Sequence, residues 1–147
     1  MTGVDIDREA VRDARGKARA RGVQAIFHDA DICAPSSIRG PFDTVLDPGL
    51  FHVLSDQRRR ALLSWLQPLI ADSGCLYLLT VAIPCSGPGA PRPVGWPELR
   101  AMFAGGWELE WIRNEMFETS DTGPGLPALL VKVRRVCKPS ALPSSSS

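Results

Sequence analysis

The sequence predicts an α/β fold with a mostly parallel sheet and an antiparallel hairpin at its C-terminal end. Short apolar runs alternate with helical patterns, which is the order of elements that builds a parallel sheet. Residues 75–83 are apolar at nearly every position, as in a strand in the middle of such a sheet. Residues 107–117 and 127–136 alternate like two β-strands on either side of a Gly/Pro-rich turn, which predicts the hairpin.

The N-terminal part is expected to form a strand, a helix and two further strands. Residues 2–5 make a short apolar strand, and Asp7 is placed to cap a helix that continues to about Arg21. Residues 23–27 predict the second strand. Residues 42–47, which carry an acid near each end, predict the third.

The clearest helical pattern lies at residues 56–71. Its apolar positions recur at intervals of three and four residues: Leu62, Trp65, Leu66 and Leu69. Pro68 is expected to loosen the last turn, because proline cannot donate the helical hydrogen bond. Residues 73–74 should turn into the apolar strand that follows. Residues 84–97, dense in proline and glycine, predict a long loop before a short helix at 98–103.

Composition suits one globular domain. We assign residues 1–137 to the domain and residues 138–147, rich in serine and proline, to a disordered tail. A net charge of +1 gives no bulk attraction to nucleic acid or to a membrane, and no apolar run is long enough to cross a bilayer. The four cysteines form no C-x-x-C pair, which favours reduced thiols in a cytoplasmic protein.

The string from His28 to Asp31 superficially suggests a metal site. The chain contains only two histidines, and no companion ligands are spaced to complete a coordination sphere. We therefore expect no bound metal. Serine residues lack the G-x-S-x-G pattern of a nucleophile elbow, so a serine hydrolase is not supported either.

Four segments, taken in order, carry a family resemblance: Thr2-Gly3-Val4-Asp5-Ile6-Asp7, Asp29-Ala30, the run from Phe42 to His52, and Ser73-Gly74. Together they resemble the class I S-adenosylmethionine-dependent methyltransferases, most closely the small-molecule type, described as methyltransferase-domain or thiopurine-methyltransferase-like. The resemblance covers roughly residues 2–136. It implies a Rossmann-like fold, S-adenosyl-L-methionine as cofactor, and a small molecule as methyl acceptor. No N-P-P-Y-like motif follows residue 47, which speaks against a nucleic-acid acceptor.

The resemblance also implies roles for the N-terminal site residues. Asp5 falls on the acid that bridges the two ribose hydroxyls, and Ile6 falls where an apolar side chain packs on adenine. Asp29 falls on the acid that accepts from the adenine amino group, with the Ala30 amide nearby. Asp31 competes with Asp29 for this role, because the register of the short strand is open by two residues.

Two further residues belong to the region where methyl transfer is expected. Asp47, at the carboxyl end of its strand, falls beside the methionine part of the cofactor. His52 follows shortly and is the candidate catalytic residue, as a base that removes a proton from the acceptor. Methyl transfer to a good nucleophile depends mainly on alignment, so a packing or hydrogen-bonding role for His52 stays open.

The family's first strand, its glycine-rich loop and the helix after it have no counterpart before residue 2. We therefore expect an N-terminally truncated domain. In the family, the missing strand lies between the strands at residues 2–5 and 42–47. Three arrangements remain open: these two strands pair directly, another polypeptide fills the gap, or the chain is a fragment.

Two functions from different classes follow. The first is an S-adenosylmethionine-dependent methyltransferase that acts on a small molecule, inactive if the truncation removes too much of the site. The alternative is a non-catalytic methyltransferase remnant that serves as a protein-interaction module. In that case the unpaired strand edges would also support self-association.

Overall fold

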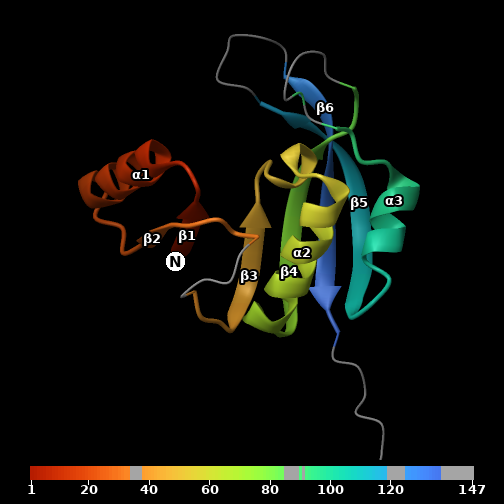
Figure 1. The fold of residues 1–147 in the computed structure, drawn as a ribbon, viewed down its shortest axis with the longest axis horizontal. Helices are drawn as coiled ribbons and strands as arrows, with labels where there is room; N and C mark the ends of the chain where they lie inside the picture. Colours follow the sequence, from red (N-terminus) through yellow and green to blue (C-terminus); the bar gives the residue numbers. More distant parts are fainter. Residues whose placement is uncertain (34–37, 85–89, 91, 119–124, 137–147) are drawn as a thin grey trace, which may run out of the picture. The chain divides into compact units, whose positions relative to one another are not determined.

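The computed structural model of the chain contains two compact units, Met1–Arg39 and Gly40–Ser147 (Figure 1). The structure describes residues 1–33, 38–84, 90, 92–118 and 125–136. The tail at 138–147 and most of the turn between the last two strands lie outside these residues.

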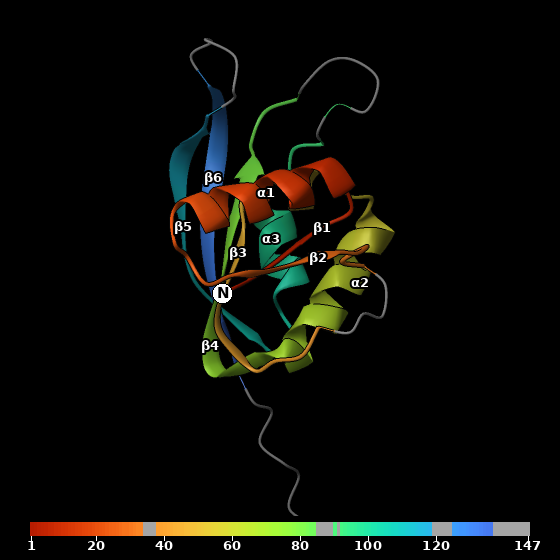
Figure 2. The ribbon, with the colours of Figure 1, turned by 90° about the vertical axis from the view of Figure 1, so that its left-hand side faces the viewer.

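Unit 1 consists of a two-stranded parallel sheet and one helix (Figure 2). Its elements are β1 (Thr2–Asp5), α1 (Arg8–Ala20) and β2 (Ile26–Asp29). Asp7 has extended backbone angles, and its side chain accepts a hydrogen bond from the Glu9 amide at 2.8 Å. The predicted helix cap is therefore confirmed.

The second strand begins three residues later than the sequence predicted. The end of α1 explains the difference. Gly22 has a φ of +64°, its amide donates to Arg19, and the Val23 amide donates back to the Ala18 carbonyl at 2.9 Å. This pair of bonds is the usual termination of a helix at a left-handed glycine. Val23 is thus part of the helix end and not of the strand.

Unit 2 is built on a four-stranded sheet in the order β3-β4-β6-β5. The strands are β3 (Phe42–Asp47), β4 (Ile70–Val81), β5 (Trp107–Phe117) and β6 (Leu126–Arg135). β3 pairs with β4 in parallel, whereas β4–β6 and β5–β6 are antiparallel. The α/β class and the terminal hairpin are confirmed. The expected mostly parallel sheet is not, since two of the four strand pairings among the described residues are antiparallel.

The strands of each unit form a sheet of their own. Among the described strands, β1 pairs with β2 in unit 1, and β3 pairs with β4 in unit 2.

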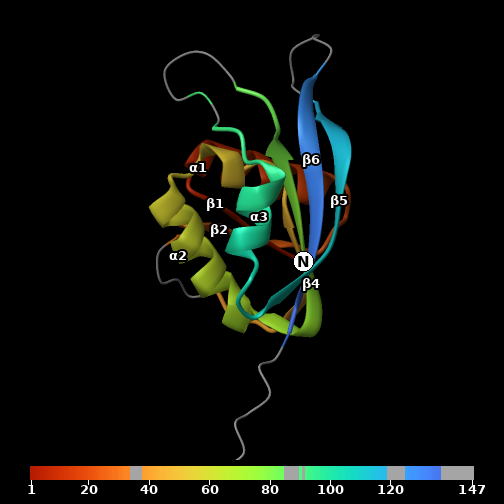
Figure 3. The same ribbon diagram turned by 90° about the vertical axis from the view of Figure 1, so that its right-hand side faces the viewer.

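The helices of unit 2 lie on one face of its sheet. α2 (Asp56–Leu66) and α3 (Trp96–Met102) are side by side there (Figure 3). α2 is shorter than predicted, because the chain passes into a 3₁₀ turn, η2 (Gln67–Leu69), at Pro68. Proline lacks the amide hydrogen that would continue the α-helix, so the predicted loosening of the last turn ends the helix instead.

The inward face of α2 is rotated relative to the prediction. Leu62 and Leu66 are buried as expected, but Trp65 is only half-buried. Leu63 and the charged Arg59 are buried in addition. The apolar pattern alone thus located the helix but misplaced its packed face.

β4 begins at Ile70, five residues before the predicted start. Its pairing with β3 shifts by three residues between Ile70 and Cys75, and Ser73 within this shift has a φ of 65°. The predicted turn at residues 73–74 is therefore a bulge inside a longer strand.

β4 was expected to be buried on both faces. On the face that holds Leu76, Leu78 and Thr80, the side chains are fully buried. The side chains on the opposite face, including Tyr77 and Leu79, are only half-buried. The antiparallel neighbour β6 makes this a mixed sheet, which can keep one face partly open to water.

Candidate cofactor and methyl-transfer site

The parallel pairing of β1 and β2 brings the first group of predicted residues together. Asp5 and Asp29 are direct partners in the register, so both strands end at the same edge of the sheet. The Ala30 amide donates to the Asp5 carbonyl at 3.0 Å. The register places Asp29, and not Asp31, beside Asp5. Asp31 lies beyond the strand and accepts a hydrogen bond from the Cys33 amide at 2.9 Å.

Asp5 holds its own turn and remains exposed. Its Oδ1 accepts a hydrogen bond from the Asp7 amide at 2.9 Å, which orients the carboxylate. A carboxylate has about four acceptor positions, so this one bond leaves capacity for hydroxyl groups of a ligand. Ile6 follows with 68% of its surface exposed, an unusual cost in water for a large apolar side chain.

Asp29 forms an ion pair with Arg8, whose Nε lies 2.8 Å from Oδ2. The Arg8 side chain is 88% exposed. An ion pair this close to water contributes little to stability, so a ligand group can compete with it at low cost.

Asp47, at the end of β3 in unit 2, is buried. Its Oδ1 accepts from the Gly49 amide at 3.0 Å and from the Leu50 amide at 2.7 Å. Gly49 has a φ of +134°, which an L side chain rarely adopts, so glycine is required at this position. Burial raises the pKa of the Asp47 carboxyl, and the backbone hydrogen bonds from Leu50 and Gly49 oppose that rise.

The second oxygen of Asp47, Oδ2, differs from the first. Among the described residues, Oδ2 is a buried oxygen without a hydrogen bond. A buried acceptor without a partner is costly, and such groups in folded proteins usually mark a ligand or a functional position.

His52 is also buried, in the 3₁₀ turn η1 (Phe51–Val53) that follows β3. Its Nδ1 accepts a hydrogen bond from the Val81 amide at 3.4 Å, and its ring makes a T-shaped contact with the Phe117 ring at a centroid distance of 5.3 Å. Burial, and secondarily the positive charge of Arg59, lowers the pKa of the His52 imidazole. The ring is therefore neutral at pH 7. Because Nδ1 accepts, its hydrogen resides on Nε2.

This tautomer limits the chemistry of His52. A neutral imidazole whose Nε2 carries the hydrogen donates from that nitrogen and cannot accept a proton there. The geometry thus favours the hydrogen-bonding role over the base. Both alternatives were open from the sequence.

No role was predicted for Arg59, which is the most buried charged residue among the described residues of unit 2. The guanidinium has no exposed surface and donates from Nε to the Phe51 carbonyl at 2.8 Å. Its Nη2 donates to the carbonyls of His52 at 3.3 Å and Arg92 at 3.2 Å. A signal was present, because Arg59 lies three residues before Leu62, on the apolar side of the predicted helix.

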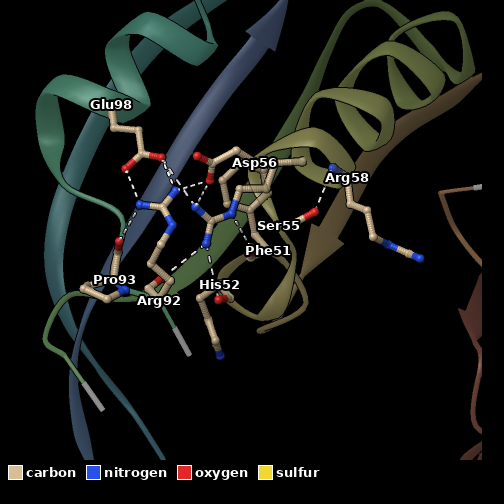
Figure 4. Close-up of polar contacts among 9 residues, drawn as sticks. Phe51, His52, Ser55, Asp56, Arg58, Arg92, Pro93 and Glu98 are labelled. Carbon is tan, nitrogen blue, oxygen red and sulfur yellow. Dashed lines mark hydrogen bonds and ion pairs between the residues drawn. The ribbon is translucent and has the colours of Figure 1, made fainter. Parts of the chain in front are cut away.

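Three charged side chains surround this guanidinium (Figure 4). The Nη1 of Arg59 lies 3.4 Å from a carboxylate oxygen of Asp56 and 3.4 Å from one of Glu98. Arg92 binds the same two carboxylates, with its Nη1 at 3.1 Å from Glu98 Oε2. These acids raise the pKa of Arg92, whereas burial lowers that of Arg59.

The described part of the chain contains no group of three or more histidine, cysteine, aspartate or glutamate side chains that could hold a metal ion. Its helices are all too short or too polar to span a bilayer.

Comparison with known proteins gives a consistent result. Residues 1–74 match the family model described as "Methyltransferase domain". A 2-heptyl-1-hydroxyquinolin-4(1H)-one methyltransferase of Mycobacteroides abscessus is 30% identical over 116 residues, which make up 75% of this chain and 50% of that protein. The chain thus spans about half the length of this curated relative.

Solved structures show the same fold. A structure from work on the conversion of a disulfide bond into a thioacetal group during echinomycin biosynthesis matches with a TM-score of 0.79 and 28% identity, over 92% of this chain and 66% of that one. A SAM-dependent methyltransferase from Methanosarcina mazei matches with a TM-score of 0.77, over 93% of this chain and 82% of that one. At 18% identity, the second likeness shows the fold alone.

Proposed function

This chain belongs to the class I S-adenosylmethionine-dependent methyltransferase family, and we propose that it binds S-adenosyl-L-methionine and directs methyl transfer to a small molecule. The observation that carries the proposal is the shared strand edge of unit 1, where Asp5 and Asp29 are register partners. Ligands of open α/β sheets bind at such carboxyl ends.

The nucleoside part of the cofactor is assigned to unit 1. The Asp5 carboxylate would accept hydrogen bonds from the two ribose hydroxyls, and Ile6 would cover a face of adenine. Asp29 would accept from the adenine amino group, with the Ala30 amide as the accompanying donor. The exposure of Ile6 supports this assignment, because a bound ring would remove its apolar surface from water.

In unit 2, Asp47 is proposed as a ligand-binding residue in its own right. The buried Oδ2 without a partner fits a positively charged donor such as an ammonium group. A cation there would supply the missing hydrogen bond and offset the burial that now raises the pKa of this carboxyl.

S-adenosylmethionine, when bound, supplies a methyl group activated by its positive sulfur. The residues of this chain contribute by orientation. Nε2 of His52 would donate a hydrogen bond to the acceptor molecule and hold its nucleophilic atom in line, since alignment accounts for most of such a reaction. The acceptor then has to arrive already deprotonated, or release its proton to solvent, because this tautomer takes no proton at Nε2.

For the acceptor we propose a small heterocyclic molecule with an oxygen, nitrogen or sulfur nucleophile. The support is the likeness to the hydroxyquinolone methyltransferase, which is 30% identical. The compound in that protein's name, 2-heptyl-1-hydroxyquinolin-4(1H)-one, is the first acceptor to test with methyl-labelled cofactor.

The experiment that tests cofactor binding is calorimetric titration with S-adenosylhomocysteine. We expect the wild-type chain to bind and Asp5→Ala to bind at least about tenfold more weakly, because a charged hydrogen-bond acceptor is lost. Asp7→Ala is the matched control: it removes the same charge two residues away, from a carboxylate that caps a helix. Absence of binding heat from the wild type at millimolar ligand would contradict the proposal.

A second function, the interaction module, is favoured by one observation. β3 is an edge strand of its sheet, and Leu46 on it is 70% exposed. An open strand edge with apolar side chains can pair with another chain. Light scattering tests this: concentration-dependent association that Leu46→Lys abolishes would support it, and a monomer at all concentrations would contradict it.

A further inference from the structure

We propose that Arg59 is a positioning residue, which joins the turn containing His52 to the segment containing Arg92 and thereby holds the His52 ring as an Nε2 donor. Its significance for methyl transfer rests on the proposed function. The positioning itself does not, and can be measured without cofactor or acceptor.

The Arg59 guanidinium donates hydrogen bonds to three backbone carbonyls. Nε and Nη2 of Arg59 donate to the carbonyls of Phe51 and His52, two consecutive residues of the turn. Nη2 also donates to the carbonyl of Arg92, which is 33 residues further along the chain. A planar fork of five N–H donors can hold several carbonyls at fixed angles, whereas the single ammonium of lysine cannot.

The turn that contains His52 and the segment that contains Arg92 also contact each other directly. The Arg92 amide donates to the His52 carbonyl at 3.0 Å, so that carbonyl accepts from both arginines. Two residues on, the Val94 amide donates to the Val81 carbonyl at 3.4 Å. The segment at 92–94 is therefore fixed both to the His52 turn and to the end of β4.

The His52 ring has neighbours from several elements of the chain. β4 provides the Val81 amide that donates to Nδ1, and β5 provides Phe117, whose ring makes a T-shaped contact with that of His52. α2 provides the positive charge of Arg59, and the 92–94 segment provides Arg92, which donates to the carbonyl of His52. With the backbone of the turn held by Arg59, Nδ1 stays within reach of the Val81 amide, and the charge disfavours a second proton on the ring.

The buried positive charge of Arg59 is compensated by acidic neighbours. A buried charge without partners would be expelled or would unfold the site. A carboxylate oxygen of Asp56 and one of Glu98 each lie 3.4 Å from Nη1 of Arg59. The Arg92 side chain forms ion pairs with the same two acids (Figure 4). Arg92 thus contributes in two ways. Its carbonyl accepts a hydrogen bond from Arg59, and its side chain binds the two acids that lie beside the Arg59 guanidinium.

The test is a ¹⁵N NMR titration of the histidine rings in the full chain. Only His28 and His52 are present, so His28→Asn identifies the His52 signals. The wild type is expected to show a neutral His52 with its hydrogen on Nε2, titrating below the ordinary histidine range. Arg59→Met should raise the titration midpoint and replace the single tautomer by a mixture. Arg60→Met, a change of the exposed neighbour on the same helix, should leave both unchanged.

Arg59→Lys separates charge from geometry. It keeps the positive charge but loses the fork, so we expect a mixture of tautomers with a midpoint closer to that of the wild type. If either folded variant of Arg59 retains the wild-type tautomer and midpoint, the proposal is wrong. If neither variant folds, Arg59 is a structural core residue and the proposal is equally wrong. Because the measurement uses no ligand, a failure of S-adenosylhomocysteine to bind would not alter its reading.

Discussion

The two units place their candidate site residues in opposite environments. In unit 1, Asp5 and Asp29 end short strands and are exposed, and the buried apolar side chains among the described residues are only Val11 and Ile38. In unit 2, Asp47 and His52 are themselves buried, and buried apolar side chains come from three strands, β4, β5 and β6, and from the helices α2 and α3.

This difference indicates two ways of preparing a site. The carboxylates of unit 1 face water and are held mainly by contacts within their own turns. A ligand that binds them therefore gains the net binding free energy of the new hydrogen bonds. The groups of unit 2 are already removed from water and held by backbone hydrogen bonds. The cost is a buried carboxylate oxygen that forms no hydrogen bond with the described part of the chain. Substitutions should therefore affect mainly ligand affinity in unit 1 and mainly stability in unit 2.

The largest effect is expected for Arg59→Met. Removing the guanidinium leaves buried carbonyls and nearby acids without their donor, which should lower the free energy of unfolding by about 3–5 kcal/mol. Urea unfolding followed by tryptophan fluorescence measures this, because all four tryptophans lie in unit 2. Arg60→Met should change it by less than about 0.5 kcal/mol. Equal effects of the two substitutions would show that the buried network does not stabilise unit 2.

A smaller effect is expected for Asp47→Ala. The Gly49 and Leu50 amides lose their acceptor, at a cost of about 1–3 kcal/mol. Asp47→Asn keeps an acceptor oxygen for these amides and should cost less. A larger loss for Asn than for Ala would contradict the role assigned to Oδ1.

The Asp47 carboxyl also predicts a pH dependence. Burial raises its pKa above the ordinary value of 3.8, so the folded chain binds this proton more tightly than the unfolded chain does. Protonation on lowering the pH from 7 toward 4 thus stabilises the fold, and this stability is lost as the pH rises through the folded pKa. Relative to Asp47→Asn, the wild type should become more stable in urea as the pH falls. A constant difference would be evidence against the raised pKa.

Asp7→Ala tests how much a side-chain hydrogen bond contributes to the stability of unit 1. Loss of the helix cap should destabilise α1 by about 1 kcal/mol and reduce helical circular dichroism. The tryptophan signal of unit 2 should not change. Asp13→Ala, in the middle of the same helix, is the control for loss of charge, and we expect it to leave the helical signal intact.

The smallest effect is expected for Arg8→Met. This arginine forms an exposed ion pair with Asp29, which contributes little to stability, so the unfolding midpoint should stay within error. A clear loss of stability would mean that the strand-end acids of unit 1 are structural, as those of unit 2 are.

Sequence reasoning located most elements because each has a local cause. The cap at Asp7 and the alternation in residues 107–117 are properties of neighbouring residues, and both are found in the structure. The shared edge of Asp5 and Asp29 has a different cause, the parallel pairing of β1 with β2, and the roles of these acids were expected from the family resemblance alone. The burial of Arg59 could not be predicted from the sequence. It depends on hydrogen bonds to the carbonyls of His52 and Arg92, and no local sequence pattern connects Arg59 with these residues.

The tautomer of His52 was out of reach for a related reason. It depends on the amide of Val81, which is 29 residues away in the sequence. The bulge that starts β4 at Ile70 likewise depends on pairing with β3, whereas the sequence shows only a Ser-Gly pair that is typical of a turn.

The most direct test of the central claim is a thermodynamic cycle between Asp5 and the ribose hydroxyls. Affinities of the wild type and of Asp5→Ala are measured for S-adenosylhomocysteine and for its 2′,3′-dideoxy analogue. If the carboxylate binds the diol, removing the hydroxyls should weaken binding to the wild type by about tenfold or more and leave binding to Asp5→Ala nearly unchanged. Equal losses for both proteins would show that Asp5 does not contact the ribose, and would contradict the assignment of the nucleoside site.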